Sequence, residues 1–205
     1  MKVADGGWFP LVVGLVIFTV MTTWFAGRRI LAERLAEGAM STEMFVDQLS
    51  TGKIGRVRGT AIFLTRQQRG IPTALLHNIK HNKIVHEKLI LLSVNVEEVP
   101  HLARDERAEW TDLGQGIYRL VLRFGFMEEP NIPAQLEQIG GPIEFEPMST
   151  SYFLGRETLV PTRHAGMALW REHLFAWMAR NATSASSFFS LRANQVIELG
   201  AQVRI

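Results

Sequence analysis

The segment from Trp8 to Ala26 (WFPLVVGLVIFTVMTTWFA) contains nineteen consecutive residues and no charge. A helix of that length extends about 28 Å, close to the roughly 30 Å hydrocarbon core of a bilayer. A secretory signal peptide would have a shorter apolar core, a basic front and a small-residue cleavage site, and buried helices of soluble proteins usually have shorter apolar runs. The segment therefore predicts a transmembrane helix.

The charges on either side of this segment predict its orientation. Arg28, Arg29 and Arg34 follow it, whereas Lys2 and Asp5 precede it. Under the positive-inside rule the C-terminal side faces the cytoplasm. Trp8 and Trp24 lie near the two ends, where indole rings favour the membrane–water boundary.

Small and polar residues form a stripe on the cytoplasmic half of the helix: Thr19, Thr22, Thr23 and Ala26. Such a stripe lets a second helix approach closely. Alternatively, each threonine hydroxyl bonds the backbone carbonyl one turn earlier. The sequence leaves both interpretations open.

The rest of the 205-residue chain is long enough for one domain with its own core. Segment 27–38 is helical and either extends the membrane helix or lies along the inner leaflet. A short helix opens at Ser41 and ends near Gly52. We therefore expect a membrane helix with its extension over 1–38, a tether over 39–55 and a cytosolic domain over 56–205.

Strand-like and helix-like patterns alternate in the predicted domain. Strands are expected over 57–64, 89–96, 117–126, 151–154 and 196–205, and helices over 72–81, 131–139 and 167–180. The charged segment 103–110 is expected to be a surface helix or loop, and 184–187 a loop. Helix 167–180 carries an apolar stripe that includes Trp170, Leu174 and Trp177. These patterns predict an α/β domain with about five strands in an open, mainly parallel sheet.

Catalytic motifs are missing from the sequence. Thr51-Gly52-Lys53 lacks the first glycine and the Ser/Thr of a P-loop, and it precedes a strand instead of following one. No dinucleotide fingerprint, metalloprotease motif or nucleophile elbow occurs. Because there is no cysteine, thiolate nucleophiles and disulfides are also excluded. We therefore expect a protein that is not an enzyme.

One group of polar residues could bind a ligand: His77, Asn78, Lys80, His81, Asn82 and Lys83. His77 and His81 have the i, i+4 spacing of metal ligands, but too few further ligands lie nearby, so no metal site is expected. The group belongs to a basic segment, since residues 53–88 hold eight Lys/Arg and one acid. It is therefore a candidate site or interface for an anion or nucleotide, expected near the carboxyl end of the first strand. Alternatively, the same residues cap the C-terminus of their helix.

Several motifs resemble the C-terminal portion of Kup-type potassium uptake permeases. Two sets of residues carry the resemblance. The last membrane helix of that family is matched by Asp5–Leu11, Met21–Trp24 and Arg28-Arg29, and its cytosolic domain by Arg58–Leu64, Ile71–Lys83, His86–Leu92 and Val196–Gly200.

This resemblance implies a role in proton-coupled K⁺ uptake at a bacterial inner membrane, with the C-terminal domain in the cytoplasm. K⁺ and H⁺ are then transported ions, and no cofactor or nucleic acid is expected. The family has many membrane helices, whereas one is predicted here, so the resemblance implies a C-terminal fragment or split product. Its partners would be the bilayer and the missing membrane helices, and no transport residue carries over.

In that family the cytosolic domains resemble universal stress proteins, some form homodimers and some bind a cyclic dinucleotide. The resemblance thus implies a regulatory and assembly domain. The alternative is a single-pass membrane-anchored sensor that binds an anionic or nucleotide ligand.

Overall fold

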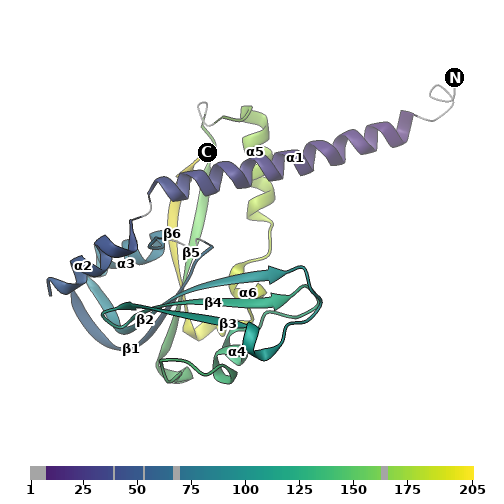
Figure 1. The fold of residues 1–205 in the computed structure, drawn as a ribbon. Coiled ribbons are helices and arrows are strands. Elements are labelled where there is room, and N and C mark those ends of the chain that lie inside the picture. Colours follow the sequence, from purple (N-terminus) through teal and green to yellow (C-terminus); the bar gives the residue numbers. More distant parts are fainter. Residues whose placement is uncertain (1–7, 39, 53, 67–69, 163–165) are drawn as a thin grey trace. The chain divides into compact units, whose positions relative to one another are not determined.

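The computed structural model describes residues 8–38, 40–52, 54–66, 70–162 and 166–205 (Figure 1). Its helices and strands, in chain order, are α1 (Trp8–Glu37), α2 (Thr42–Ser50), β1 (Gly55–Leu64), α3 (Thr73–Asn82), β2 (Ile84–Glu97), the 3-10 turn η2 (Arg104–Glu106), β3 (Ala108–Gly114), β4 (Ile117–Gly125), α4 (Ile132–Gln138), η3 (Pro147–Ser149), β5 (Thr150–Val160), α5 (Leu169–Arg180), α6 (Ala185–Phe188), η4 (Ala193–Gln195) and β6 (Val196–Arg204).

These elements form two compact units. Unit 1 consists of the described parts of Met1–Glu37, Glu157–Ala182 and Gln202–Ile205. Unit 2 consists of the described parts of Gly38–Arg156 and Thr183–Ala201.

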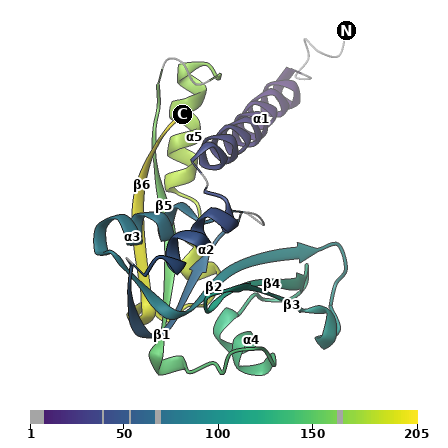
Figure 2. The same ribbon diagram turned by 60° about the vertical axis from the view of Figure 1, so that its left-hand side comes forward.

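One mostly parallel sheet is built from the described strands, in the order β3-β4-β2-β1-β5-β6 (Figure 2). β1 pairs in parallel with β2 and with β5, β2 pairs in parallel with β4, and β3 is the antiparallel edge next to β4. The predicted α/β class and the mainly parallel sheet are thus confirmed. The sheet has six strands where about five were expected.

Alternating residues along the central strands form two separate cores in unit 2. Ala61 and Phe63 of β1 pack with Phe45 of α2 and Leu75 of α3. Ile62, between them, packs in a second core with residues of α4 such as Ile132. Because successive side chains of a strand point to opposite faces, α2 and α3 cover one face of the sheet and α4 covers the other.

The short helix α2 is attached to the sheet through both its start and its apolar side. Ser41 caps it by accepting a hydrogen bond from the N–H of Met44 at 3.3 Å. Phe45 and Leu49 are buried in the first core. Arg119 of β4 donates hydrogen bonds to the Thr42 hydroxyl and the Gly70 carbonyl.

The structure differs from the sequence prediction in five segments. Segment 103–110 was expected to be a surface helix or loop; it contains the short turn η2, but residues from Ala108 onward form the edge strand β3. Most of segment 184–187, expected to be a loop, belongs to the short helix α6. β2 begins five residues before the expected start, and β5 continues six residues beyond the expected end. In α5 the predicted apolar stripe is not the buried side of the helix, because its Trp170 and Trp177 are exposed, whereas Phe175, outside that stripe, is buried.

Unit 1 combines the long helix α1 with α5 and the ends of β5 and β6. α1 is unbroken from Trp8 to Glu37, so segment 27–37 extends the apolar helix. At the strand ends, the N–H of Ile205 donates to the Val160 carbonyl, and the N–H of Thr162 donates to the Ile205 carbonyl. Ile205 thus bonds to two residues that are two positions apart on the neighbouring strand, which is the hydrogen-bond pattern of a parallel pair. Glu172 of α5 is fully buried and accepts the N–H of Thr162 at 3.0 Å.

A polar cluster around Glu128 lies beyond the carboxyl ends of β2 and β4. Glu128 pairs with Arg107, whose guanidinium also donates to the Leu102 carbonyl at 3.0 Å. The other Glu128 oxygen accepts the N–H of Gly125 at 2.8 Å. Burial raises the pKa of Glu128, but the N–H of Gly125 and the charge of Arg107 outweigh it, so the pKa lies below its ordinary value.

We predict that Glu128→Gln lowers the free energy of unfolding by about 2 kcal/mol near neutral pH, since it weakens a largely buried pair. A carboxylate with a depressed pKa stabilises the fold above its unfolded-state pKa, and that contribution is lost as the pH falls through the folded-state value. As the pH falls below 4.5, the ordinary pKa of a glutamate carboxyl, the wild-type chain should therefore lose stability more steeply than the variant. Thermal unfolding in detergent across a pH series measures this.

Glu129→Gln is the matched control, because Glu129 is an exposed neighbouring carboxylate. It should leave the unfolding profile unchanged. Identical acid profiles for wild type and Glu128→Gln would contradict the assignment.

Candidate functional site

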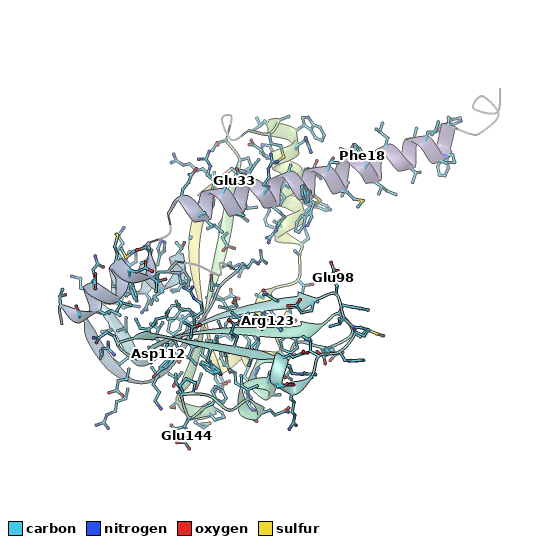
Figure 3. The ribbon with its side chains drawn as sticks, in the orientation of Figure 1. Phe18, Glu33, Glu98, Asp112, Arg123 and Glu144 are labelled. Carbon is cyan, nitrogen blue, oxygen red and sulfur yellow. The ribbon has the colours of Figure 1, made fainter. Side chains whose placement is uncertain are left out.

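The N-terminal part of α1 is an apolar helix with little of the described chain packed against it. Its large side chains are mostly exposed, among them Leu11, Leu15 and Phe18 at about two-thirds exposure (Figure 3). By length and composition this is the one described helix that could cross a membrane. A surface this apolar is unfavourable in water, so it requires a lipid or protein environment.

The threonines of α1 do not all agree with the same one of the two interpretations that the sequence left open. The Thr19 and Thr22 hydroxyls donate to the carbonyls of Leu15 and Phe18, each at 2.8 Å. Thr23 is fully buried, and its hydroxyl accepts a hydrogen bond from Arg171 Nε of α5 at 2.9 Å. The hydroxyls of Thr19 and Thr22 therefore bond backbone carbonyls of their own helix, whereas Thr23 contacts a second helix.

The contact between α1 and α5 depends on a glycine. Phe175 is buried against Gly27, and a Cβ at that position would overlap the phenylalanine ring. The same ring meets Trp24 edge-on, with 5.6 Å between ring centroids. The missing side chain of Gly27 thus allows α5 to pack on α1 at the end of the uncharged segment.

The six predicted site residues lie on α3 and directly after it, where several of them stabilise the helix end. Asn78 is buried, and its amide donates to the Ile84 carbonyl at 3.0 Å and accepts from the Asn82 amide at 2.8 Å. Lys83 ends the helix in the left-handed conformation, with φ 56°, and its N–H donates to the Ile79 carbonyl. This hydrogen bond is the usual closure of a helix C-terminus.

His77 and His81 face each other edge-on with 6.1 Å between ring centroids. Among the described residues, no group of three potential metal-binding side chains is present. The exposed side chains of Lys80, His81 and Lys83 add positive charge at the C-terminal end of α3.

This charged helix end lies at the opposite end of the sheet from the expected one. The Lys83 carbonyl accepts the N–H of Gly55, the first residue of β1. The expected position near the carboxyl end of the first strand is therefore wrong. A helix that returns between parallel strands ends where those strands begin, so its last turn lies at their amino ends.

Further basic residues lie in the first parts of β1 and β2, near the same end of the sheet. Arg56 and Arg58 are exposed on β1, and Lys88 is exposed on β2. His86 of β2 is partly covered by Phe153, and burial lowers the pKa of this histidine. The uncharged imidazole therefore contributes little to the positive charge near neutral pH.

A hollow of about 380 Å³ on the α4 side of unit 2 was not indicated by the sequence. Its lining includes Arg104, Trp110, Gln135 and Ile139. The buried indole nitrogen of Trp110 has no hydrogen-bond partner among the described residues. No sequence motif marks this hollow, because its lining comes from β3, α4 and the turn that precedes β3.

The family model described as K⁺ potassium transporter C-terminal domain matches residues 58–205. Probable potassium transport system proteins Kup of Erythrobacter litoralis and Myxococcus xanthus are each 51% identical to this chain, and a Kup 2 protein of Rhizorhabdus wittichii is 52% identical.

Each of these alignments covers 100% of the chain and 32–33% of the relative. The chain thus spans about a third of the length of the curated relatives that it matches, and the matched third is C-terminal. No solved structure matches it. The expected likeness to universal stress proteins therefore stays a prediction.

We predict that Asn78→Ala destabilises unit 2 by about 1–2 kcal/mol, because it removes the two hydrogen bonds of the buried Asn78 amide, to the Ile84 carbonyl and from the Asn82 amide. Lys80→Ala, on the exposed side of the same helix, should change stability by less than about 0.5 kcal/mol. Chemical denaturation in detergent measures both. An Asn78→Ala variant as stable as Lys80→Ala would contradict a capping role.

Proposed function

The chain belongs to the family of K⁺ potassium transporter C-terminal domains, and from that premise we propose that it works as part of a proton-coupled potassium uptake permease. In this proposal α1 is the last membrane helix, and unit 2 is a cytoplasmic domain for regulation and assembly. The assembled protein resides in a bacterial inner membrane. The carrying observation is the close similarity of the entire chain, α1 included, to Kup potassium transport proteins.

The surface of α1 supports its placement in a membrane as part of a larger assembly. Its apolar side chains between Trp8 and Phe25 are largely exposed, and lipid or neighbouring helices would cover them. Arg28 and Arg29 follow the apolar segment, which favours a cytoplasmic location for everything after it.

Transport requires more than this chain. Ion pathways use polar or charged groups from several helices that surround a cavity. α1 has no ionisable residue between Trp8 and Gly27, and its Thr19 and Thr22 hydroxyls are bonded to its own backbone. We infer that the ion sites belong to other membrane helices, and that K⁺ and H⁺ are ions moved by the assembled permease.

The basic amino ends of β1 and β2 are the proposed regulatory surface. Arg56 and Arg58 come from β1, and Lys80 and Lys83 from the end of α3 and the position directly after it. The Lys83 carbonyl is bonded to the N–H of Gly55 at the start of β1. This positive charge suits a phosphate-containing ligand such as a cyclic dinucleotide.

We predict that the chain alone fails to restore growth of a potassium-uptake-deficient strain at low K⁺. Co-expression with the N-terminal two-thirds of a close relative should restore growth. Matched expression of both pieces is checked by immunoblotting of membranes. Growth with the chain alone would contradict the proposal that the ion sites belong to other membrane helices.

We also predict that a cyclic dinucleotide raises the unfolding temperature of the chain in detergent, because a ligand that binds the folded state stabilises it. Lys80→Ala should reduce the shift, while Arg192→Ala, which removes an exposed arginine elsewhere in unit 2, should not. If a millimolar ligand produces no shift in the folded wild-type chain, the regulatory proposal fails.

A further inference from the structure

We propose that α5 is an interfacial helix whose exposed face lies in the head-group region of the lipid leaflet at the C-terminal end of the α1 apolar segment. That face consists of Leu169, Trp170, His173, Trp177 and Arg180. The inference deepens the proposed function and rests on α1 being a membrane span.

The contact with α1 fixes the depth of α5. α5 meets α1 at Thr23, Trp24 and Gly27, and the first charges after the apolar segment are Arg28 and Arg29. Thr23 and Gly27 are about 6 Å apart along a helix. The polar interface on each side of the hydrocarbon core has a similar thickness. A helix attached at these residues therefore lies at the boundary between hydrocarbon and water.

The attachment is well defined, since three contacts made by two residues of α5 hold it. Phe175 is fully buried on Gly27, Arg171 donates to the buried Thr23 hydroxyl at 2.9 Å, and Phe175 meets the Trp24 ring. Phe175 lies on the side of α5 opposite its two exposed tryptophans, and Arg171 lies between the two sides. When that side packs on α1, the exposed face remains uncovered by the described chain.

The direction of α5 also suits the interface. Figures 1 and 2 show α5 crossing α1 steeply instead of running beside it. Because α1 spans the bilayer in the proposed function, a helix that crosses it steeply at this depth extends along the membrane surface. Monotopic amphipathic helices have this orientation.

The exposed face has the chemistry of the interface. Trp170 and Trp177 are 58% and 59% exposed, and they are seven residues apart, so they lie on the same side of the helix. Indole rings favour the membrane–water boundary over both water and hydrocarbon. Two large exposed tryptophans would otherwise be an unfavourable surface for a protein in water.

The charges of α5 are complementary to anionic head groups. Arg180 is exposed beside the tryptophans, and Arg171 lies next to the α1 contact. The acidic residue of α5, Glu172, is fully buried and accepts the backbone N–H of Thr162. The outward face therefore carries positive charge only, as lipid phosphates require.

Site-directed spin labelling tests this proposal directly, because the chain has no cysteine of its own. His173→Cys places a label between the two tryptophans while keeping both. Val16→Cys, at the exposed centre of the apolar segment, reports the span, and Thr158→Cys, on an exposed part of β5 in the same unit, reports water. The full chain is reconstituted into vesicles of phosphatidylethanolamine and phosphatidylglycerol, and collisions with oxygen and with a water-soluble nickel chelate are measured.

We expect the Val16 label to collide mainly with oxygen, the Thr158 label mainly with nickel, and the His173 label to lie between them, with several-fold less nickel contact than Thr158. Replacing Trp170 and Trp177 by serine in the His173→Cys chain should increase its nickel contact. Met148→Ser, which removes a fully exposed apolar residue in unit 2, should not.

Three other outcomes overturn the proposal or its premise. If the His173 label matches Thr158, α5 lies in water and the interfacial proposal fails while the span stands. If the label is shielded from both reagents, a protein surface covers the face and lipid is not its partner. If the Val16 label is accessible to nickel, the membrane span itself is wrong, and with it the proposed function.

Discussion

The uncharged surface of α1 is the constraint on which the other features of unit 1 depend. Helix backbone groups bond internally, so this segment can be solvated by lipid tails, but its exposed valine, leucine and phenylalanine side chains cannot be solvated favourably by water. Only its last turns carry a contact from within the described chain, where Thr23 and Gly27 accommodate α5. The position of that contact, between apolar and charged sequence, links the membrane requirement to the folded part of unit 1.

In unit 2 the corresponding constraint is the two-sided burial of a parallel sheet. Central strands such as β2 are apolar on both faces, so helices must cover both, and α2, α3 and α4 do so. Three polar side chains within this arrangement have specific partners. Arg119 joins α2 to β4, Asn78 closes the end of α3, and Glu128 holds the loops beyond β2 and β4. The exposed basic side chains lie near the amino ends of the strands, whereas the end of α3 is closed by the Asn78 side chain and the Lys83 backbone.

Much of the fold follows from residue patterns, and the exceptions have physical causes. Helix α1, the capped starts of α2 and α4, and strands β1, β4 and β6 were predictable because capping residues and periodic apolar side chains mark them locally. β3 was not, since an edge strand exposes charged residues such as Glu109, and its stability comes from pairing with β4. The two faces of α5 could not be separated either, because burial of Phe175 depends on Gly27, which is 148 residues away from it in the sequence. The site residues on α3 were identified correctly as a helix end. Their position relative to the sheet could be predicted only by noting that α3 runs from the end of β1 back to the start of β2.

The charged edge of the sheet limits how copies of the domain can associate. Glu109 and Asp112 are exposed on β3, and Glu109 already pairs with Arg123 of the neighbouring strand. A second sheet aligned antiparallel against this edge would bring carboxylates close to their own counterparts, and like charges opposite each other destabilise strand pairs. Continuous intermolecular sheet growth across β3 is therefore disfavoured, which protects this domain from edge-to-edge aggregation.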